Sequence, residues 1–469
     1  MSEHAPNLET VTTIRADGSR RFLHPAASRG PYTRMRAWVG TVLLLIYFAL
    51  PWIQINGAPA VFLDIAARQF HLFGLTFVAQ DLWLLFFLIT GVGFLLFYTT
   101  ALLGRIWCGW ACPQTVILDI ARRIERWIEG DHLVRRRMDN EPATFGQSLR
   151  RGAKNLVLAG FAFLLAHVWL SYFVSIPRLY QMMHASPGEH WAAFCFVFLL
   201  TGALWFNLAW FREQFCIVLC PYGRLQSALT DSNSLVIGYD ASRGEPRSKR
   251  SPAFADPSMR QRGDCIDCRR CVEVCPTGID IRQGLQLECI GCAACVDACA
   301  EVMHKLHRPA GLIRYDSLNG FAGKATRWIR PRIVLYSILL LVGASALCAA
   351  LSTLRPVTMV LGRVRGTPYV LENDLVRNQF LVRILNKRSE PMQLRLELPG
   401  TPAALQMAGF HEPVTLPPLG EALRPLVVSL PRTEFTREFP VTLRLVAMDG
   451  RTILERTLPF AGPVSYTDP

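Results

Sequence analysis

Charged side chains are scarce in this sequence. They make up 18% of its 469 residues, against about 25% in an average soluble domain, whereas hydrophobic residues make up 51%. Such a chain is too apolar for an ordinary soluble enzyme and long enough for several domains. The N-terminus also lacks a cleavable signal, because residues 1–35 are polar and no cleavage site follows the first apolar run near Trp38. We therefore expect a retained membrane anchor.

Cysteine is absent from the chain after Leu354, although the sequence contains 14 cysteines in total. Twelve of them occur in Cys-x-x-Cys or Cys-x-x-x-Cys spacings. Disulfide scaffolds are small and secreted, so this regular spacing indicates reduced thiolates that hold metal in a reducing compartment. Cys195 and Cys348 fall within apolar runs, where packing is their expected role.

Five segments are long and apolar enough to cross a bilayer, which takes about 20 residues. They are 38–55, 82–103, 156–176, 191–211 and 333–354. Buried helices of a large soluble protein are the alternative, but Trp and Tyr near the ends of these runs favour the membrane. The sequence therefore predicts a membrane α-helical protein with five transmembrane helices.

The distribution of basic residues predicts the orientation. Arginines are frequent in the N-terminal arm, and basic residues are frequent between the second and third runs and between the fourth and fifth. The loop between the first and second runs has Arg68 as its only Lys or Arg, and the loop between the third and fourth runs has only Arg178. The positive-inside rule then places the N-terminus in the cytoplasm and the C-terminus outside. Membrane topology explains the net charge of +14 better than nucleic acid does, so no nucleic-acid partner is expected.

The last part of the chain changes character. Short runs with near period-two alternation, such as QFLVRILNK and MQLRLELPG, predict an Ig-like β-sandwich, and Asp449-Gly450 is typical of a hairpin turn. The predicted domains are a cytoplasmic arm (1–36), a four-helix membrane domain (37–237) and a linker (238–262). The repeated cysteine motifs CIDCRRCVEVCP and CIGCAACVDAC then predict a dicluster ferredoxin domain (263–310). A cytoplasmic connector (311–332), a fifth transmembrane helix (333–354) and a periplasmic Ig-like domain (355–469) complete the chain.

The segment CIDCRRCVEVCP carries four cysteines, and CIGCAACVDAC repeats their spacing. This run holds 4Fe–4S clusters in two-cluster bacterial ferredoxins, where the fourth cysteine of each motif binds the other cluster. The first cluster would use Cys265, Cys268, Cys271 and Cys299. The second cluster would use Cys289, Cys292, Cys295 and Cys275. A pair of zinc sites is the alternative, but zinc sites usually show two Cys-x-x-Cys pairs separated by a longer gap.

Two further cysteine pairs lie just past the second and fourth apolar runs. Cys108 and Cys112 occur in RIWCGWACPQ, and Cys216 and Cys220 occur in QFCIVLCPYG. If a helix continued through each pair, its two thiols would share one face, and the following proline would begin a new helix. Four converging thiols could bind copper, iron or a cluster, or cycle between dithiol and disulfide. Simple packing at helix ends is the alternative.

With these motifs in place, nearly the whole chain resembles the FixG/CcoG (RdxA-like) family of cytochrome c oxidase accessory proteins. The resemblance rests on PWIQINGAPAVFLDI, RIWCGWACPQTVILDIARRIERWIEGD, FCIVLCPYGRLQSAL, the dicluster segment and the Ig-like C-terminal region. Ala300 stands where a symmetric ferredoxin would have a second Cys-Pro proline, but Cys299 is kept.

The resemblance implies a role in the assembly of the cbb3-type terminal oxidase, with copper supply and a cupric reductase activity. The cofactors would be two 4Fe–4S clusters, with copper bound by Cys108, Cys112, Cys216 and Cys220 as redox thiols. The partners would be the lipid bilayer, oxidase subunits or a copper-export ATPase, and an unidentified electron donor. Two other functions remain open, namely a quinol-linked electron-transfer subunit similar to NapH and a non-enzymatic assembly scaffold.

Overall fold

The computed structural model describes residues 13, 20, 22–78, 81–248, 263–364, 366–400 and 402–463. The chain divides into two compact units: the first comprises 1–50 and 85–347, and the second comprises 51–84 and 348–469. Residues 1–12, 14–19 and 21 of the predicted N-terminal arm and residues 249–262 of the predicted linker lie outside the described residues.

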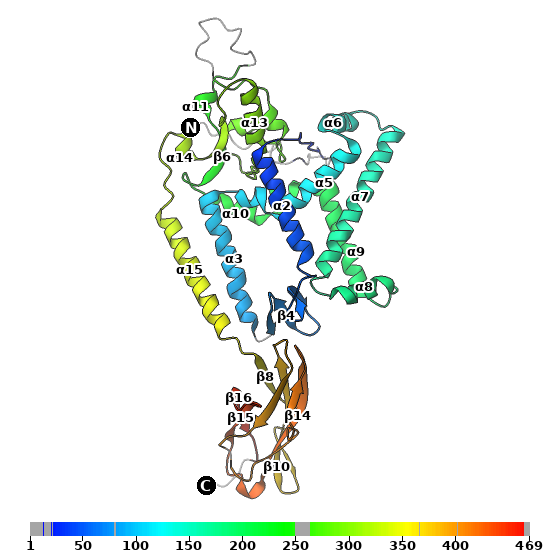
Figure 1. Ribbon diagram of the computed structural model, residues 1–469, viewed down its shortest axis with the longest axis vertical. Coiled ribbons are helices and arrows are strands. Elements are labelled where there is room, and N and C mark those ends of the chain that lie inside the picture. The colour runs from blue at the N-terminus through cyan, green and yellow to red at the C-terminus, as the bar shows by residue number, and fades with distance from the viewer. Residues whose placement is uncertain are drawn as a thin grey trace. The chain divides into compact units, whose positions relative to one another are not determined.

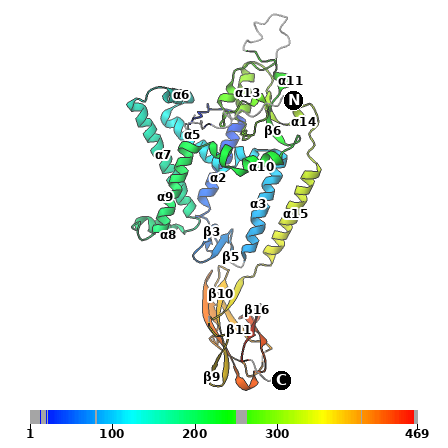
Figure 2. The same ribbon diagram turned by 180° about the vertical axis from the view of Figure 1, so that it is seen from behind.

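Helices dominate the membrane part of the chain (Figure 1). They are α2 (Pro31–Ala49), α3 (Leu82–Leu103), α4 (Ile106–Trp110), α5 (Pro113–Glu129), α6 (His132–Asn140), α7 (Phe145–Leu170), α8 (Ile176–His184), α9 (Trp191–Phe206), α10 (Pro221–Leu229) and α15 (Pro331–Ser352). Two π-helical turns, η2 (Asn207–Phe211) and η3 (Phe215–Leu219), follow α9. Helices α7 and α9 run side by side, as Figure 1 and Figure 2 both show.

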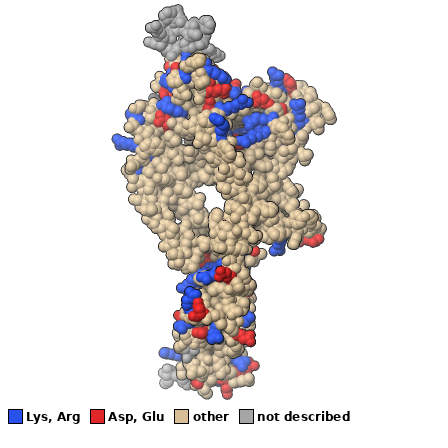
Figure 3. Space-filling model, viewed as in Figure 1, with Lys and Arg blue, Asp and Glu red and all other residues tan. Residues whose placement is uncertain are grey.

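Four helices of the described chain are long and apolar enough to cross a membrane: Leu82–Leu103, Phe145–Leu170, Trp191–Phe211 and Pro331–Ser352. Their apolar side chains face outward; Phe86 is 66% exposed and Leu341 is 70% exposed. In Figure 3 these helices form an almost uncharged surface of the first unit, whereas charged side chains gather mostly over α5, α6 and α13 (Ala294–Lys305). Exposed apolar surface of this extent belongs in lipid, so the chain is a membrane protein.

The first predicted span differs in its extent. Helix α2 ends at Ala49, six residues before the predicted end at Ile55, and residues Gln54–Ile55 form strand β1. Pro51 explains this end, because proline lacks the backbone N–H that would continue the helical hydrogen bonds beyond Leu50. Helix α2 also carries Arg34 and Arg36 in its first two turns and is not among the four apolar helices.

The third predicted span is also displaced, because α7 begins well before residue 156 and ends at Leu170. Thr144 caps this helix in a reciprocal arrangement with Gln147, which fixes the start. Ile176, the predicted end of the span, opens the separate helix α8.

The cysteine-rich part of the first unit is a small α/β fold. Strands β6 (Leu235–Tyr239) and β7 (Ile313–Ser317) pair antiparallel and flank the two cysteine loops in sequence. The short helices are α11 (Ala241–Gly244), α12 (Arg270–Glu273), η6 (Ile281–Gln283) and α14 (Leu318–Phe321), and the longer one is α13. Buried Ile237, Ile281 and Val296 form its apolar core, together with cysteine side chains.

The second unit contains a β-sandwich of two antiparallel sheets. One sheet has the order β12-β14-β10-β8 with β9 paired to β10, and the other has the order β13-β11-β15-β16. The strands are β8 (Val357–Arg363), β9 (Val370–Glu372), β10 (Leu375–Asn386), β11 (Met392–Glu397), β12 (Gln406–Ala408), β13 (Val414–Leu416), β14 (Glu421–Pro431), β15 (Phe439–Ala447) and β16 (Thr452–Phe460). Alternate residues of both sheets fill the core, as the period-two pattern predicts.

The predicted hairpin turn at Asp449-Gly450 is confirmed, because it joins the paired strands β15 and β16. Gly450 has φ +82°, a conformation that favours glycine. The second unit also contains two small sheets, β1 with β2 (Ala58–Pro59), and β3 (Val61–Asp64), β4 (Gln69–Leu72) and β5 (Leu75–Val78). Lys387 forms an ion pair with Asp81 within this unit.

Candidate iron–sulfur and thiol sites

The two cysteine loops turn in the same way. In each loop the residues on either side of the second cysteine have positive φ: Asp267 and Arg269 in the first loop, and Gly291 and Ala293 in the second. Helices α12 and α13 begin directly after these turns. Left-handed residues at alternate positions can turn successive backbone N–H groups toward one point. A loop of this kind is therefore suited to bind an anionic group.

The first set of thiols comprises Cys265, Cys268, Cys271 and Cys299. Burial, together with the neighbouring thiolates of Cys268 and Cys265, raises the pKa of Cys299 to about 12. Burial also raises the pKa of Cys271 to about 12, and Cys299 and Cys268 again add to the effect. The last cysteine of the second loop therefore lies among the first three cysteines of the first loop.

The second set comprises Cys275, Cys289, Cys292 and Cys295. Burial, together with the thiolates of Cys292 and Cys275, raises the pKa of Cys289 to about 12. Burial raises the pKa of Cys295 as well, with contributions from Cys292, Cys289 and Cys275. This grouping is consistent with the predicted crossed arrangement, in which each loop would supply one ligand to the other cluster.

These eight cysteines fit iron–sulfur clusters in their chemistry. The second set lines a small cavity, whose other walls include Ile237, Ile279 and Ile281. Soft thiolates are the usual ligands of such clusters, and dry apolar walls limit access of water to them.

The spacing of the thiols does not suit a single bare ion. Among the described residues, no group of three or more His, Cys, Asp or Glu side chains is close enough to hold one metal ion. A tetrahedral zinc ion needs four ligands at about 2.0–2.3 Å, whereas the four thiolates of a cubane each bind a different iron and stand farther apart.

The four membrane-end cysteines also come together. Burial raises the pKa of Cys108 to about 12; Arg105 lowers it, and the thiolates of Cys112, Cys216 and Cys220 raise it. Burial likewise raises the pKa of Cys216 to about 12, with Cys112 and Cys220 adding to the effect. We call these four residues the four-thiol site.

The local structure of the two pairs differs from the expected continuous helix. Helix α4 ends at Trp110, and Cys112 is an extended N-cap residue of α5, with Pro113 in the first turn. Cys220 is likewise an extended N-cap residue of α10. The prediction that Pro113 and Pro221 begin new helices is confirmed, and the residue before each proline leaves helical geometry because of the proline ring.

Backbone contacts join the four-thiol site to the second cysteine loop. Gly109 lies against Gly291, because a Cβ on Gly109 would stand 2.7 Å from the carbonyl carbon and oxygen of Gly291. Trp110 donates through Nε1 to the Tyr315 hydroxyl (3.1 Å), which donates to the Gly291 carbonyl oxygen (2.6 Å). Cys108 packs against an apolar cluster that includes Cys292.

Three arginines reach carbonyl oxygens of the second set and its flanking residue. Arg105 donates through Nη1 to Cys289 O (3.2 Å), Arg36 through Nη1 to Cys292 O (3.5 Å) and Arg122 through Nη2 to Pro276 O (3.0 Å). The sequence analysis missed these three roles, because the arginines were assigned only to membrane topology.

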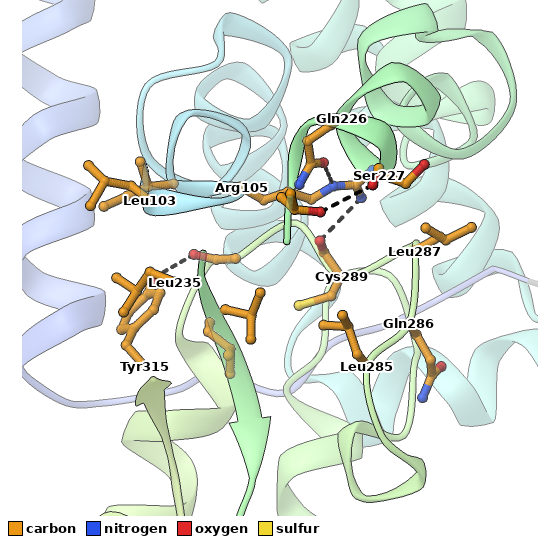
Figure 4. Close-up of a pocket in the computed structure, with 15 residues that line it drawn as sticks. Leu103, Arg105, Gln226, Ser227, Leu235, Leu285, Gln286, Leu287, Cys289 and Tyr315 are labelled. Atoms are coloured by element: carbon orange, nitrogen blue, oxygen red, sulfur yellow. Dashed lines mark hydrogen bonds between the residues drawn. The ribbon is translucent and has the colours of Figure 1, made fainter. Parts of the chain in front are cut away.

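A cavity of about 220 Å³ lies beside the second set (Figure 4). Its apolar walls include Leu103, Leu235 and Leu287, and its polar wall includes Arg105 and Gln226. Figure 4 shows Arg105 with hydrogen bonds to Gln226 and to the carbonyl of Cys289. The cavity therefore lies next to a thiol of the second set and next to Leu103, the last residue of an apolar helix.

Sequence reasoning also missed a buried network of ion pairs, which includes Glu125 of helix α5. Glu125 is 1% exposed and accepts hydrogen bonds from Arg212 and Arg135. Although burial would raise the pKa of Glu125, these arginines hold it below its ordinary value. Glu213 forms further ion pairs with Arg20 (2.6 Å) and Arg122 (3.5 Å). An acidic residue on the apolar side of a basic helix was the available sequence signal.

Comparisons with known proteins agree with these features. Residues 211–318 match a family model described as a 4Fe-4S dicluster domain, and residues 83–137 match one described as a 4Fe-4S binding domain. Residues 347–463 match a model described as the IG-like fold at the C-terminal of FixG. Fold and site thus define a membrane-bound iron–sulfur protein of the ferredoxin type with an Ig-like C-terminal domain.

Relatives identify the family. "Nitrogen fixation protein FixG" of Rhizobium meliloti is 35% identical over 91% of this chain and 90% of that protein. "Protein RdxA" of Cereibacter sphaeroides is 35% identical over 84% of this chain and 87% of that protein. The chain belongs to the FixG/RdxA family. "Ferredoxin-type protein NapH" of Escherichia coli is more distant, with 26% identity over 36% of this chain and 59% of that protein.

Proposed function

We propose that this chain is an iron–sulfur electron-transfer protein that acts in the assembly of a cbb3-type cytochrome oxidase and reduces Cu(II) to Cu(I). One observation carries this proposal: the four-thiol site lies directly against the loop of the second set, through Gly109 and Gly291. A site made of soft thiols beside a cluster-binding loop is suited to accept an electron and to retain Cu(I).

In this proposal, Cys265, Cys268, Cys271 and Cys299 hold one cluster, and Cys275, Cys289, Cys292 and Cys295 hold the other. When bound, the clusters supply one-electron transfer. The protein contributes buried thiol ligands, backbone N–H groups at the left-handed turns and arginines that donate to neighbouring carbonyl oxygens.

Copper is the substrate at the four-thiol site. Each Cu(II) takes up one electron and becomes Cu(I), which soft thiolates favour over Cu(II). Two thiolates suffice for a two-coordinate Cu(I), so Cys108, Cys112, Cys216 and Cys220 need not all bind one ion. The positive charge of Arg105, which lowers the pKa of Cys108 and Cys216, favours the thiolate forms that copper requires.

The proposed topology has five spans, with α2 as the first. The N-terminus and both thiol sites then face the cytoplasm, and the Ig-like domain faces the periplasm. Cu(I) would pass to a copper-export ATPase or to oxidase subunits, and the Ig-like domain is available for docking to such a partner. Lipid is the other partner, and none of this involves nucleic acid.

A second candidate function is quinol oxidation, which the cavity beside Cys289 favours. A quinol from the membrane could enter where Leu103 ends an apolar helix and release its two protons to solvent, while its two electrons reduce the two clusters. Similarity to NapH over part of the chain fits this candidate. In this second candidate function, the electron donor is a quinol.

The test uses protein purified without oxygen, with iron and sulfide analysis followed by EPR. Cu(II) added to the dithionite-reduced protein should oxidise the clusters and yield Cu(I), and Cys108→Ser and Cys220→Ser should each slow that oxidation. If both variants reduce Cu(II) normally, the site assignment is wrong. Reduction of the clusters by a quinol would support the second candidate. Cluster-free variants that still support oxidase assembly would indicate a scaffold instead.

A further inference from the structure

Arg105 occupies a special position between the two redox sites. It lies two residues after the end of α3 and is the N-cap residue of α4, which carries Cys108. Its guanidinium donates to three acceptors: Cys289 O of the second cysteine loop, and Gly223 O and Gln226 Oε1 of helix α10. Helix α10 begins directly after Cys220. One side chain thus joins the second cysteine loop to both halves of the four-thiol site.

The partners of Arg105 are all neutral. Within the part of the chain that the structure describes, no Asp or Glu lies within ion-pair distance of it. The other two arginines at the second set are neutralised: Arg36 pairs with Asp119 (2.8 Å), and Arg122 with Glu213 (3.5 Å). Of these three arginines, Arg105 is therefore the one that forms no ion pair in the part of the chain that the structure describes.

Among the described residues, the arginines whose charges act on the first set of thiols are ion-paired, unlike Arg105. Arg282, whose charge affects Cys271, pairs with Asp280 (2.6 Å) and Asp267. Arg243, whose charge affects Cys299, pairs with Asp264 (2.5 Å). The charges of these paired side chains therefore largely cancel. Arg269, which follows Cys268, forms no ion pair among the described residues, but it is exposed, so solvent and salt screen its charge.

We propose that Arg105 is a positioning residue that raises the reduction potential of the second cluster above that of the first and holds its loop against the four-thiol site. The physical reason is that a reduced cluster carries one more negative charge than an oxidised one, so an uncompensated cation nearby stabilises the reduced form. Electrons should then collect at the cluster bound by Cys275, Cys289, Cys292 and Cys295, next to the copper thiols. This inference rests on the proposed function for its direction of electron flow.

The contacts of Arg105 also require its fork-shaped head group. A guanidinium offers five N–H donors in fixed directions, whereas a lysine ammonium is a single point charge. Lysine would keep the charge but could not reach all three acceptors from the same stem. Arg105→Lys therefore changes the hydrogen-bond geometry but keeps the positive charge, whereas Arg105→Gln removes the charge.

The experiment is a redox titration of the purified full-length protein, monitored by EPR, together with stopped-flow oxidation of the dithionite-reduced protein by Cu(II). In Arg105→Gln, we expect the potential of one cluster to fall while the other stays unchanged. In Arg105→Lys, we expect little change of potential but oxidation by Cu(II) that is slower by about 10–100-fold, the range seen when groups around metal ligands are removed. Arg224→Gln is the matched control, because Arg224 is exposed on α10 and, among the described residues, its side chain hydrogen-bonds only to the Val218 carbonyl oxygen, at 3.4 Å.

The outcomes separate this inference from the proposed function. Unchanged potentials of both clusters in Arg105→Gln, with iron and sulfide at wild-type levels, would overturn the inference. If Arg105→Gln loses iron, Arg105→Lys decides, and an unchanged oxidation rate in that variant would overturn the inference. If Cu(II) fails to oxidise the wild-type clusters, the proposed function is wrong, but the shift of potential still tests Arg105.

Discussion

Gly109 and Gly291 lie back to back, and a Cβ on Gly109 would stand 2.7 Å from the Gly291 carbonyl carbon and 2.8 Å from Cys292 Cα. These neighbours are backbone atoms, which cannot move aside as the end of a flexible side chain can. Glycine at position 109 thus sets how closely the four-thiol site approaches the second cysteine loop.

Gly109→Ala should push these two segments apart. Overpacking of this kind typically costs about 1–3 kcal/mol, and we expect a lower melting temperature in detergent and slower oxidation of the reduced clusters by Cu(II). Gly93→Ala is the control, because nothing lies within 4 Å of a Cβ at that position in α3. Equal behaviour of the two variants would show that the contact is unimportant.

Crossed ligation predicts which cysteines act together. Cys275→Ala should remove the same EPR signal as Cys289→Ala, and Cys299→Ala the signal that Cys265→Ala removes. Each variant should lose about four of about eight iron atoms, since each cluster contains four. Loss of the same signal in Cys275→Ala and Cys265→Ala would mean that the ligands do not cross. Cys195→Ala, in the span of α9, should keep all its iron.

Replacement of the buried carboxylate Glu125 should destabilise the membrane-proximal part of the protein. Glu125→Gln leaves Arg212 and Arg135 without their shared counter-charge, and breaking a buried ion pair typically costs about 3–5 kcal/mol. Thermal unfolding in detergent, monitored by circular dichroism, measures this loss. Glu301→Gln is the control, because the Glu301–Lys305 pair is exposed and such pairs contribute about 0–1 kcal/mol.

The same network predicts a dependence on pH. Because its arginine partners hold the pKa of Glu125 below the ordinary 4.5, the stabilisation is present above that pH and is lost as the pH falls through the lower native pKa. The melting temperature of the wild type should therefore drop more steeply below about pH 4.5 than that of Glu125→Gln. Parallel curves for the two proteins would argue against an ionised Glu125.

The β-sandwich core should respond to a single truncation. Leu394 is 0% exposed in strand β11, and Leu→Ala at such a site typically costs about 2–5 kcal/mol. Leu423→Ala is the control, because Leu423 is 56% exposed and surface changes usually stay within about 0.5 kcal/mol. Limited proteolysis of the full-length protein across a urea series compares the two, and equal resistance would contradict the assignment of this core.

Much of the protein follows from its sequence. Cysteine spacing such as Cys289-x-x-Cys292-x-x-Cys295 constrains a short loop, so it predicts the kind of cofactor without any knowledge of distant contacts. Long apolar runs and period-two alternation likewise predict helices in lipid and a β-sandwich, because these patterns act over a few residues. Helix ends were less predictable: α2 stops at Ala49 before a proline, and α7 starts early at a cap.

Only the tertiary structure decided how distant segments meet. Cys108 and Cys216 come together through the packing of helices that are far apart in the chain, and no local pattern specifies that packing. The same holds for Arg105, which local sequence marks only as a basic residue beside a span, although in the folded chain it donates to Cys289 O. Local spacing therefore determined the chemistry of each site, whereas long-range packing determined which sites are neighbours.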